Sequence, residues 1–477
     1  MRVQPGCNDN ADAEGVSVAT TEALALQRST AKVFVIVNVS VENNLQFSIF
    51  NSQFKSVYAL VDCNNFFCSV ERVFCPGLWH RPVCVAGSND GIIVALTQEA
   101  KALGLKRGDA VFKVRDIVER HGVKVFSTNM TLYAAMSKRI TSILRSMVQK
   151  VESYSIDECF CYLDGYDHVG SLEEYMRRVA QRITLYTDIP VSVGIAPTKT
   201  LAKVGSKFAK RYKGYRSVCM IDSEEKRRRA LELFDLADVW GIGRQTLRKL
   251  NYYGIHTTID FADKRENWVR SHFNKPVVDT WRELNGIPCI DTTEVAERQS
   301  ICTSRSFGQM VTDLDALKES VVTFASGCAI KLRGQGSVTR AVTVFVTTNR
   351  FREDLPQYAD SDTEQLSMPT ADTLEIVSAA IRALKRIYRE GYSYKKSGVI
   401  LTDISRADCL QLDLFDEVRN RPQRMALMRA IDHINQSYGA NKLCIGSSNA
   451  AAPSWQNKCD HRSSNYLTDI KGILQVG

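Results

Sequence analysis

The sequence of 477 residues lacks the features of membrane and secreted proteins. No run reaches the roughly 18 apolar residues that a membrane-spanning helix needs. The N-terminus also has no basic start, apolar run and small-residue cleavage site of a signal peptide. We therefore expect a cytoplasmic protein without a membrane partner.

Patterns of zinc and disulfide proteins are missing as well, although the chain contains 14 cysteines. No two cysteines are spaced Cys-x2-Cys, and among the 7 histidines no pair completes a zinc site. We interpret the cysteines as reduced thiols of a cytoplasmic protein.

The composition is that of a globular protein, with 44% apolar and 24% charged residues. The length leaves room for three or four domains, each with its own core. The net charge of +9 is compatible with a nucleic-acid partner. It does not demonstrate one, because many basic proteins bind no polyanion.

Residues 1–55 differ from the rest of the chain. The first thirty are small and polar, without a period that would bury one face, and a β-branched run follows at 33–41. An appended strand, a disordered tail and sequence upstream of the true start codon all fit this pattern. No function is assigned to this extension.

From residue 56 onward, short apolar runs alternate with helical patterns. Val57–Val61 predicts a buried strand that ends on Asp62, and a helix is expected to begin at Phe66. Val191–Ile195 predicts another strand, with a helix after it at 199–210. Mixed strands and helices without strict βαβ alternation predict an α+β fold.

Three acidic residues have the arrangement of a two-metal site. Asp62 closes a strand, and Asp157 and Glu158 follow about 95 residues later near the turn of a predicted hairpin at 151–163. Singly, each is explained by a helix cap or an acidic turn. Together they place oxygen ligands for hard cations on adjacent strands. Two such ions about 4 Å apart activate an attacking hydroxyl and stabilise a leaving oxygen.

Five segments resemble motifs of the Y-family DNA polymerases, in the same order, and the first is closest to the UmuC-like branch. They are Tyr58–Glu71, Glu99–Gly108, Tyr154–Phe160, Val193–Lys203 and Ser304–Gly308. The resemblance covers roughly residues 56–475. It implies an α+β right hand with palm, fingers and thumb, plus a little-finger domain.

The resemblance also implies domain boundaries. An extension at 1–55 precedes a palm formed by 56–66 and 125–213, with fingers at 67–124. A thumb with a helix-hairpin-helix is expected at 214–292 and a little finger at 300–405. A linker at 406–420 and a small C-terminal domain at 421–477 complete the chain.

At the active site, the resemblance assigns metal and nucleotide roles. Asp62 and Asp157 would bind two Mg²⁺ ions, joined by the backbone carbonyl of Cys63, and Glu158 would hold the ion that activates the primer 3′-hydroxyl. Phe67 matches the steric gate, an aromatic ring that clashes with the 2′-hydroxyl of a ribonucleotide. UmuC-like proteins commonly have Tyr at this position, and Phe keeps the bulk.

Triphosphate binding requires cations and free N–H groups. The helix start at Asn65–Phe67 offers N–H groups, and Lys101 and Lys203 match basic residues on the β- and γ-phosphates. Other Y-family members have Tyr-x-x-Arg where this chain has Gln98 and Lys101. Lysine supplies a point charge in place of a bidentate fork, which puts the contacts there in doubt. A solvated surface role is the alternative for each lysine.

A glycine hairpin predicts a DNA contact in the thumb. Leu236–Leu250 is interpreted as a helix-hairpin-helix with Gly241, Ile242 and Gly243 at its turn. Glycine lets backbone N–H groups approach a DNA phosphate closely, which is a grip independent of base sequence.

The segment Gln411–Phe415 matches the short peptide with which bacterial polymerases bind the sliding clamp. Leu414 and Phe415 would fill an apolar pocket, with Leu412 before them, and Gln411 would hydrogen-bond at its rim. The following tail resembles the small C-terminal domain of UmuC-like proteins. Its role does not follow from the sequence.

The resemblance implies an error-prone translesion DNA polymerase acting in DNA repair and the SOS response. It would extend primer-template DNA with dNTPs, with a UmuD-like protein and a RecA-type recombinase filament as partners. Two alternatives stay open. A palm-type cyclase or two-metal phosphodiesterase predicts neither a steric gate nor a DNA-binding thumb. A non-catalytic factor that binds clamp and DNA would have lost a carboxylate.

Overall fold

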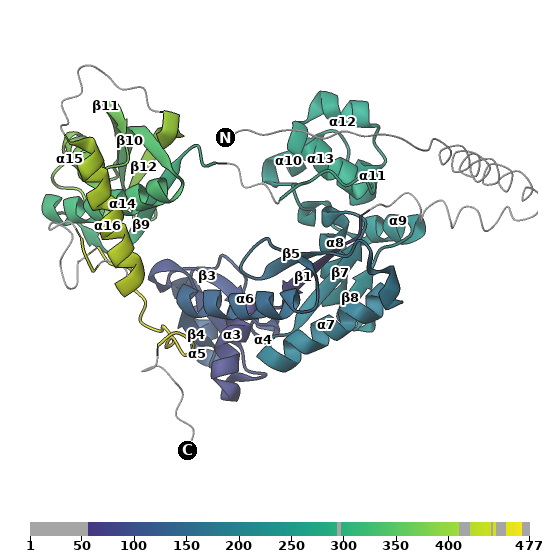
Figure 1. The fold of residues 1–477 in the computed structure, drawn as a ribbon. Helices are drawn as coiled ribbons and strands as arrows, with labels where there is room; N and C mark the ends of the chain where they lie inside the picture. The colour runs from purple at the N-terminus through teal and green to yellow at the C-terminus, as the bar shows by residue number, and fades with distance from the viewer. Residues whose placement is uncertain (1–55, 293–296, 410–419, 440–441, 445–454, 470–477) are drawn as a thin grey trace, which may run out of the picture. The chain divides into compact units, whose positions relative to one another are not determined.

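The computed structural model describes residues 56–292, 297–409, 420–439, 442–444 and 455–469 (Figure 1). Within these ranges the strands form three sheets, which we call the central, small and C-terminal sheets. The extension at 1–55 and the predicted clamp-binding segment lie outside the described residues. No helix in the described ranges is long and apolar enough to cross a membrane.

The central sheet has the strand order β5-β6-β1-β7-β8. Its strands are β1 (Tyr58–Cys63), β5 (Lys150–Ser153), β6 (Glu158–Tyr162), β7 (Val191–Ala196) and β8 (Val218–Met220). Strand β1 pairs antiparallel with both β6 and β7, and β5 and β6 form the predicted hairpin.

Strand β8 lies after the predicted end of the palm in the sequence. It pairs in parallel with β7 and therefore belongs to the central sheet, although the palm was expected to end at residue 213. The strand is only three residues long, too short for its apolar period to stand out in the sequence.

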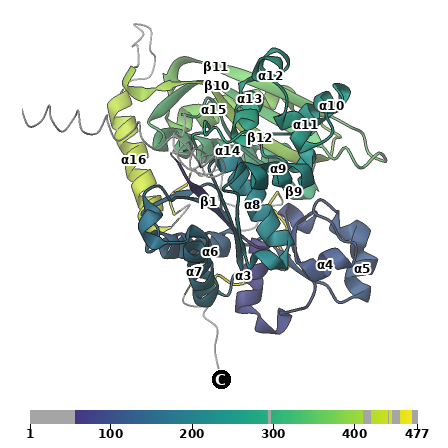
Figure 2. The ribbon, with the colours of Figure 1, turned by 90° about the vertical axis from the view of Figure 1, so that its right-hand side faces the viewer.

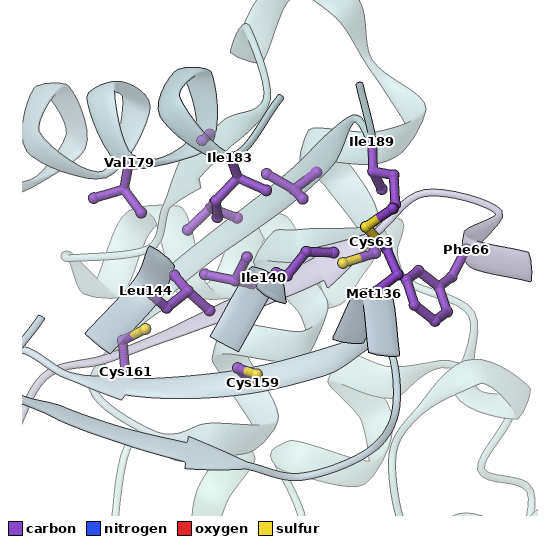
Figure 3. Close-up of a cluster of buried hydrophobic side chains, with 14 of the residues drawn as sticks. Cys63, Phe66, Met136, Ile140, Leu144, Cys159, Cys161, Val179, Ile183 and Ile189 are labelled. Carbon is purple, nitrogen blue, oxygen red and sulfur yellow. The ribbon is translucent and has the colours of Figure 1, made fainter. Parts of the chain in front are cut away.

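Helices α6 (Met130–Arg145) and α7 (Leu172–Thr187) cover one face of the central sheet (Figures 1 and 2). Their apolar side chains share one buried core with the strands. Figure 3 shows sheet cysteines beneath side chains of both helices, and its labels include Cys63, Cys159, Cys161, Met136, Ile140, Leu144, Val179 and Ile183. Cys63, Cys159 and Cys161 are buried free thiols, so these sulfur atoms serve as apolar packing groups.

Helix α8 (Lys199–Arg211) lies on the opposite face of the sheet. A Cβ atom at Gly194 of β7 would lie 2.0 Å from the backbone oxygen of Ala202 and 2.2 Å from the backbone nitrogen of Ser206. Glycine is therefore required here, because the helix backbone rests directly on the strand.

Strand alternation decides which face carries the acidic residues. Leu60 and Phe160 pack in the core beneath α8. Because side chains two positions apart share a face, Asp62 and Glu158 also stand on the α8 side. The helix and the carboxylates are thus brought to the same surface of the sheet.

The small sheet has the order β3-β2-β4, and β2 runs parallel to β4. Its elements are β2 (Val83–Ala86), β3 (Ile93–Leu96), β4 (Lys124–Ser127), α3 (Phe66–Phe74), α4 (Gln98–Ala102) and α5 (Arg115–Arg120). All four residues of β4 pair with β2. The fingers boundary expected at residue 124 therefore divides a strand of one sheet.

A helical segment follows β8. It contains α9 (Glu224–Leu233), the 3-10 turn η6 (Leu236–Asp238), α10 (Arg244–Tyr252), α11 (Thr258–Ala262), α12 (Glu266–His272) and α13 (Lys275–Leu284). The first element of the predicted helix-hairpin-helix is a single 3-10 turn, and the second is the α-helix α10.

The C-terminal sheet has the order β11-β10-β12-β9 and packs against two helices. Its elements are β9 (Ile301–Val311), β10 (Ser337–Thr348), β11 (Ala359–Thr370), β12 (Tyr394–Arg406), α14 (Leu314–Gly334) and α15 (Thr373–Ile387). Helix α16 (Arg421–Tyr438) joins them through bidentate hydrogen bonds from Arg333 to Asp432.

Candidate active site

The predicted carboxylates lie at one end of the central sheet. Asp62 near the end of β1 is the direct register partner of Glu158 at the start of β6. The backbone N–H of Cys63 donates to the carbonyl of Asp157 at 2.9 Å. Because Cβ atoms of opposite residues in antiparallel strands are about 4.5–5.5 Å apart, the fold brings Asp62 and Glu158 side by side.

A serine organises the turn that carries the acidic pair. The hydroxyl of Ser155 donates to Asp157 Oδ1 at 2.7 Å. Ser155 Oγ in turn accepts from the backbone N–H of Glu158 at 3.0 Å and from that of Asp157 at 3.3 Å. Sequence analysis did not single out Ser155, although a serine before an acidic pair in a turn signals such local bonding.

Two lysines of α8 neutralise the facing carboxylates. Lys210 Nζ lies 3.1 Å from Asp62 Oδ1, and Lys203 Nζ lies 2.9 Å from Glu158 Oε2. The two lysines are seven residues apart, so they project from the same side of the helix. Sequence analysis missed Lys210, and its spacing from Lys203 was the available signal.

The electrostatics of Asp62 favour a bound cation. Burial raises the pKa of its carboxyl group above the usual value, Lys210 counteracts this, and the nearby Glu158 and Asp157 add to the increase. A buried group surrounded by like charges is disfavoured as an anion unless positive charge is close. The oxygen donors at this end of the sheet therefore match the chemistry of a divalent cation.

The described residues do not contain a closed metal cage. No three histidine, cysteine, aspartate or glutamate side chains within them are arranged to hold an ion. Asp62 and Glu158 bond instead to the ammonium groups of Lys210 and Lys203. Asp62 and Glu158 are oxygen donors of the type that divalent ions prefer, and in this structure the two lysines supply the positive charge beside them.

The start of α3 lies beside further basic residues. Asn65 precedes the helix with φ +48°, in the left-handed region that asparagine tolerates. Lys101 Nζ of α4 lies 3.4 Å from Asn65 Oδ1. Burial lowers the pKa of Lys101, and Lys210 and Arg107 lower it further. Positive charge from α4, from α8 and from the turn that follows α4 thus lies near the helix N-terminus, a setting that suits an anion.

Phe67 rests on an aromatic partner. It is the second residue of α3, after the buried Phe66. Its ring is stacked on Tyr133 of α6, with centroids 4.5 Å apart and an interplanar angle of 15°. Phe67 is half-buried, so Tyr133 supports the ring from the core side.

Lys203 is also placed by aromatic rings. Its Nζ lies 4.4 Å from the ring centroid of Tyr154 and 5.2 Å from that of Trp240. Cation–π attraction holds an ammonium group over such rings. Trp240 was not predicted as a site residue, because nothing local in the sequence links it to the hairpin.

In the glycine hairpin, Gly241 and Ile242 are packed against the helical segment, whereas Gly243 has free space beside it. Gly241 has φ +92°, and a Cβ there would lie 2.2 Å from Thr280 Oγ1, so this glycine is required for packing. Ile242 is buried in the helical segment. A Cβ at Gly243 would meet no atom within 4 Å, and this glycine at the start of α10 is exposed.

Three family models match parts of the chain that together cover most of it. Residues 61–207 match the impB/mucB/samB family, and residues 298–414 match the C-terminal domain of that family. Residues 425–476 match a domain of unknown function, DUF4113.

The chain aligns with related proteins over nearly their whole length. The chain is 39% identical to protein ImpB of Salmonella typhimurium over 421 residues, which cover 87% of this chain and 99% of ImpB. It is 38% identical to protein UmuC of Salmonella typhimurium strain LT2 over 422 residues, covering 88% and 100%. DNA polymerase IV of Acetivibrio thermocellus is 26% identical over 406 residues, covering 81% and 95%.

A solved structure shares the fold. The Y-family DNA polymerase chimera of Dbh and Dpo4 aligns with a TM-score of 0.55 and 22% identity. The alignment covers 73% of this chain and 99% of the chimera. The α+β right hand expected from the sequence is thereby confirmed.

Proposed function

The chain belongs to the impB/mucB/samB family of UmuC-like, Y-family DNA polymerases, and we infer from this how its residues carry out translesion DNA synthesis. The enzyme is a DNA polymerase, and its family implies dependence on a divalent metal ion. We propose that nucleotide addition takes place where Asp62, Asp157 and Glu158 meet at the end of the central sheet.

The carboxylates are proposed to hold two Mg²⁺ ions. Asp62 and Asp157 would bind both ions with the carbonyl of Cys63, and Glu158 would bind the ion next to the primer 3′-hydroxyl. Such ions supply positive charge for ionisation of the hydroxyl and for departure of pyrophosphate. The pairing of Asp62 with Glu158 in register across β1 and β6 carries this proposal.

The nucleotide is proposed to lie between α3 and the lysines. Lys101 and Lys203 would bind the β- and γ-phosphates, and the N–H groups at Asn65, Phe66 and Phe67 would complete the contact. The bond between Lys101 and Asn65 supports this, because it brings a cation to the N-terminus of α3. Holding the triphosphate in place converts a bimolecular reaction into an attack within one complex.

Sugar selection is proposed to depend on Phe67. Tyr133 covers one face of this half-buried ring, and we propose that the other face meets the nucleotide. A fixed aromatic wall at the sugar excludes a 2′-hydroxyl by steric clash. Lesion specificity would be set elsewhere, by how much room the site leaves for the template.

We propose the remaining partners from the family relationship. Primer-template DNA would contact the exposed Gly243, and the peptide Gln411–Phe415 would bind the sliding clamp. A UmuD-like protein and a RecA-type recombinase filament are proposed to activate the enzyme in the cytoplasm. These assignments extend the family relationship to named surfaces of this chain.

Primer extension with Asp157→Ala tests the site. Loss of a metal ligand is expected to reduce the rate at least about a hundredfold. Asp116→Ala is the matched control, because Asp116 is exposed on α5 and belongs to neither the carboxylate site nor the predicted DNA-binding hairpin. The assay is run on the full chain with and without a UmuD-like protein and a RecA-type filament. Equal extension by Asp157→Ala and the parent would refute the proposed site.

A further inference from the structure

The chain's last described segment, residues 455–469, begins within the core of the C-terminal sheet. Trp455 is only 5% exposed and meets Phe324 of α14 edge-on, with ring centroids 5.6 Å apart. The backbone N–H of Gly308 in β9 donates to the carbonyl of Gln456 at 2.9 Å. A Cβ at Gly308 would lie 2.5 Å from that oxygen, so the close contact requires glycine.

The same segment continues along the small sheet, beside β4 in Figure 1. The backbone N–H of Lys458 donates to Asn89 Oδ1 at 2.9 Å. Ser127 of β4 donates its N–H to the carbonyl of His461 at 3.0 Å, and its hydroxyl accepts from the N–H of His461 at 2.9 Å. Because β4 is an edge strand, the segment covers backbone groups that the sheet leaves unpaired.

A fully buried asparagine fastens the segment to α6. Asn129 Oδ1 accepts from the N–H of Leu132 and so caps the helix. Its Nδ2 donates to the carbonyl of Ser463 at 2.9 Å and to its hydroxyl at 3.1 Å. The N-terminus of α6, one turn before Tyr133, is thus tied to the C-terminal segment.

A hydrogen-bonded chain leads from the segment to Phe67. Ser463 Oγ donates to Glu71 Oε1 at 3.0 Å, and the hydroxyl of Tyr133 donates to the same oxygen at 2.6 Å. Tyr133 in turn stacks on Phe67 at 4.5 Å. Glu71 is fully buried and follows Phe67 by one turn of α3, so the network is connected to both Phe67 and Tyr133.

Because the Glu71 carboxylate is buried, the network depends on both of its hydrogen-bond donors, Tyr133 and Ser463. Burial raises the pKa of Glu71, and the hydroxyls of Tyr133 and Ser463 counteract this. Removing one donor therefore favours the protonated form, which binds the other donor less strongly. A stack of Tyr466 on Phe74, with centroids 4.7 Å apart, holds the segment against the end of α3.

We propose that residues 455–469 act as an internal brace that positions Phe67 through Ser463, Glu71 and Tyr133. The brace joins the C-terminal sheet to the small sheet and to the N-terminus of α6. Discrimination against ribonucleotides then depends on residues at the end of the chain, within the region that matches a domain of unknown function. This inference rests on the proposed role of Phe67 as steric gate.

The first test measures kcat/KM for a dNTP and for the matching rNTP in the full chain with its partners. Tyr133→Phe keeps the stacked ring and removes the donor, and Ser463→Ala removes the donor from the brace. Each is expected to lower the dNTP-to-rNTP ratio about three- to tenfold, as expected for one lost hydrogen bond. Thr468→Ala, an exposed position on the same segment, is the matched control and should leave the ratio unchanged.

Phe67→Ala separates the two proposals. If it does not lower the ratio, the steric gate is refuted together with the inference that rests on it. If Phe67→Ala lowers the ratio and neither Tyr133→Phe nor Ser463→Ala does, the gate stands and the brace has no part in positioning it.

Hydrogen exchange tests the brace without an activity measurement. Gly308→Ala introduces a Cβ that displaces Gln456, whereas a Cβ at Gly334 would meet no atom within 4 Å. Faster exchange in β4 and at the start of α6 is expected in Gly308→Ala and not in Gly334→Ala. Unchanged protection in both variants would overturn the proposed link between the C-terminal sheet and the small sheet.

Discussion

Four lysines of α8 connect the helix to acidic residues along one side. They recur at intervals of four, four and three residues, which places them along one stripe of the helix. The pairs are Lys199 with Glu152, Lys203 with Glu158, Lys207 with Asp238 and Lys210 with Asp62. These pairs differ in exposure, since the Lys199 side chain is 2% exposed and the Lys207 side chain is 45% exposed. The exposed pair is therefore expected to contribute less to stability than the buried one.

Because the pair of Lys199 and Glu152 is buried, we predict that Glu152→Gln changes the stability of the fold in a pH-dependent way. Burial raises the pKa of Glu152, but hydrogen bonds from Thr292, Tyr162 and Lys199 outweigh it, and the net shift is downward. A lowered folded-state pKa stabilises the fold above the unfolded value of about 4.3. That stabilisation is lost as the pH falls through the folded-state pKa. The substitution should reduce the free energy of unfolding by about 1–3 kcal/mol at pH 7, and by less near pH 4.

Urea unfolding at the two pH values measures this difference. Asp238→Asn is the control, since its pair with Lys207 is exposed and should change the free energy of unfolding by less than about 1 kcal/mol. If Glu152→Gln reduced the free energy of unfolding equally at pH 7 and pH 4, the ionised form of Glu152 would not be the source of the stabilisation.

At the level of elements, the position of α8 is decided by two glycines. A Cβ at Gly194 would overlap the backbone of α8, and a Cβ at Gly205 would lie 3.1 Å from the Cα of Gly194. The helix therefore approaches β7 more closely than side chains would allow. This approach brings Lys203 and Lys210 within reach of the carboxylates on the sheet.

Gly194→Ala is expected to destabilise the fold and the site together. The added methyl group must move a helix backbone, which should reduce the free energy of unfolding by at least about 2 kcal/mol. Thermal unfolding and primer extension measure the two effects. Gly214→Ala is the control, because a Cβ there would meet no atom within 4 Å. Wild-type stability of Gly194→Ala would show that α8 has room to move away.

At the scale of the whole molecule, the residues after β12 link separate parts of the chain. Helix α16 is bonded to α14 through Arg333 and Asp432. The later segment 455–469 bonds to both the C-terminal sheet and the small sheet. The predicted clamp-binding peptide lies in sequence between β12 and α16, outside the described residues.

The clamp peptide gives a prediction at this scale. Leu414→Ala combined with Phe415→Ala should reduce clamp-stimulated primer extension about tenfold or more, because two apolar anchors are lost. Extension without the clamp should be unchanged. The combination Asp416→Ala with Glu417→Ala alters the same linker and serves as the control. An equal loss with and without the clamp would contradict a role in clamp binding.

The order of the motifs could be predicted from the sequence, and so could most of the helices and strands. The strand ending on Asp62, the hairpin at Asp157 and the helix beginning at Phe66 are all present, because their apolar periods and turn residues act over short distances. Strand β11 was not predicted, since much of it is exposed and polar at the edge of its sheet.

The sequence by itself determined the family and the strands and helices that carry the predicted acidic residues. Only the tertiary structure decided that Asp62 faces Glu158, that Lys210 pairs with Asp62 and that Tyr133 supports Phe67. The bond between Ser463 and Glu71 joins residues 392 positions apart. Such contacts depend on how strands pair and helices pack, and no local period of the sequence encodes that geometry.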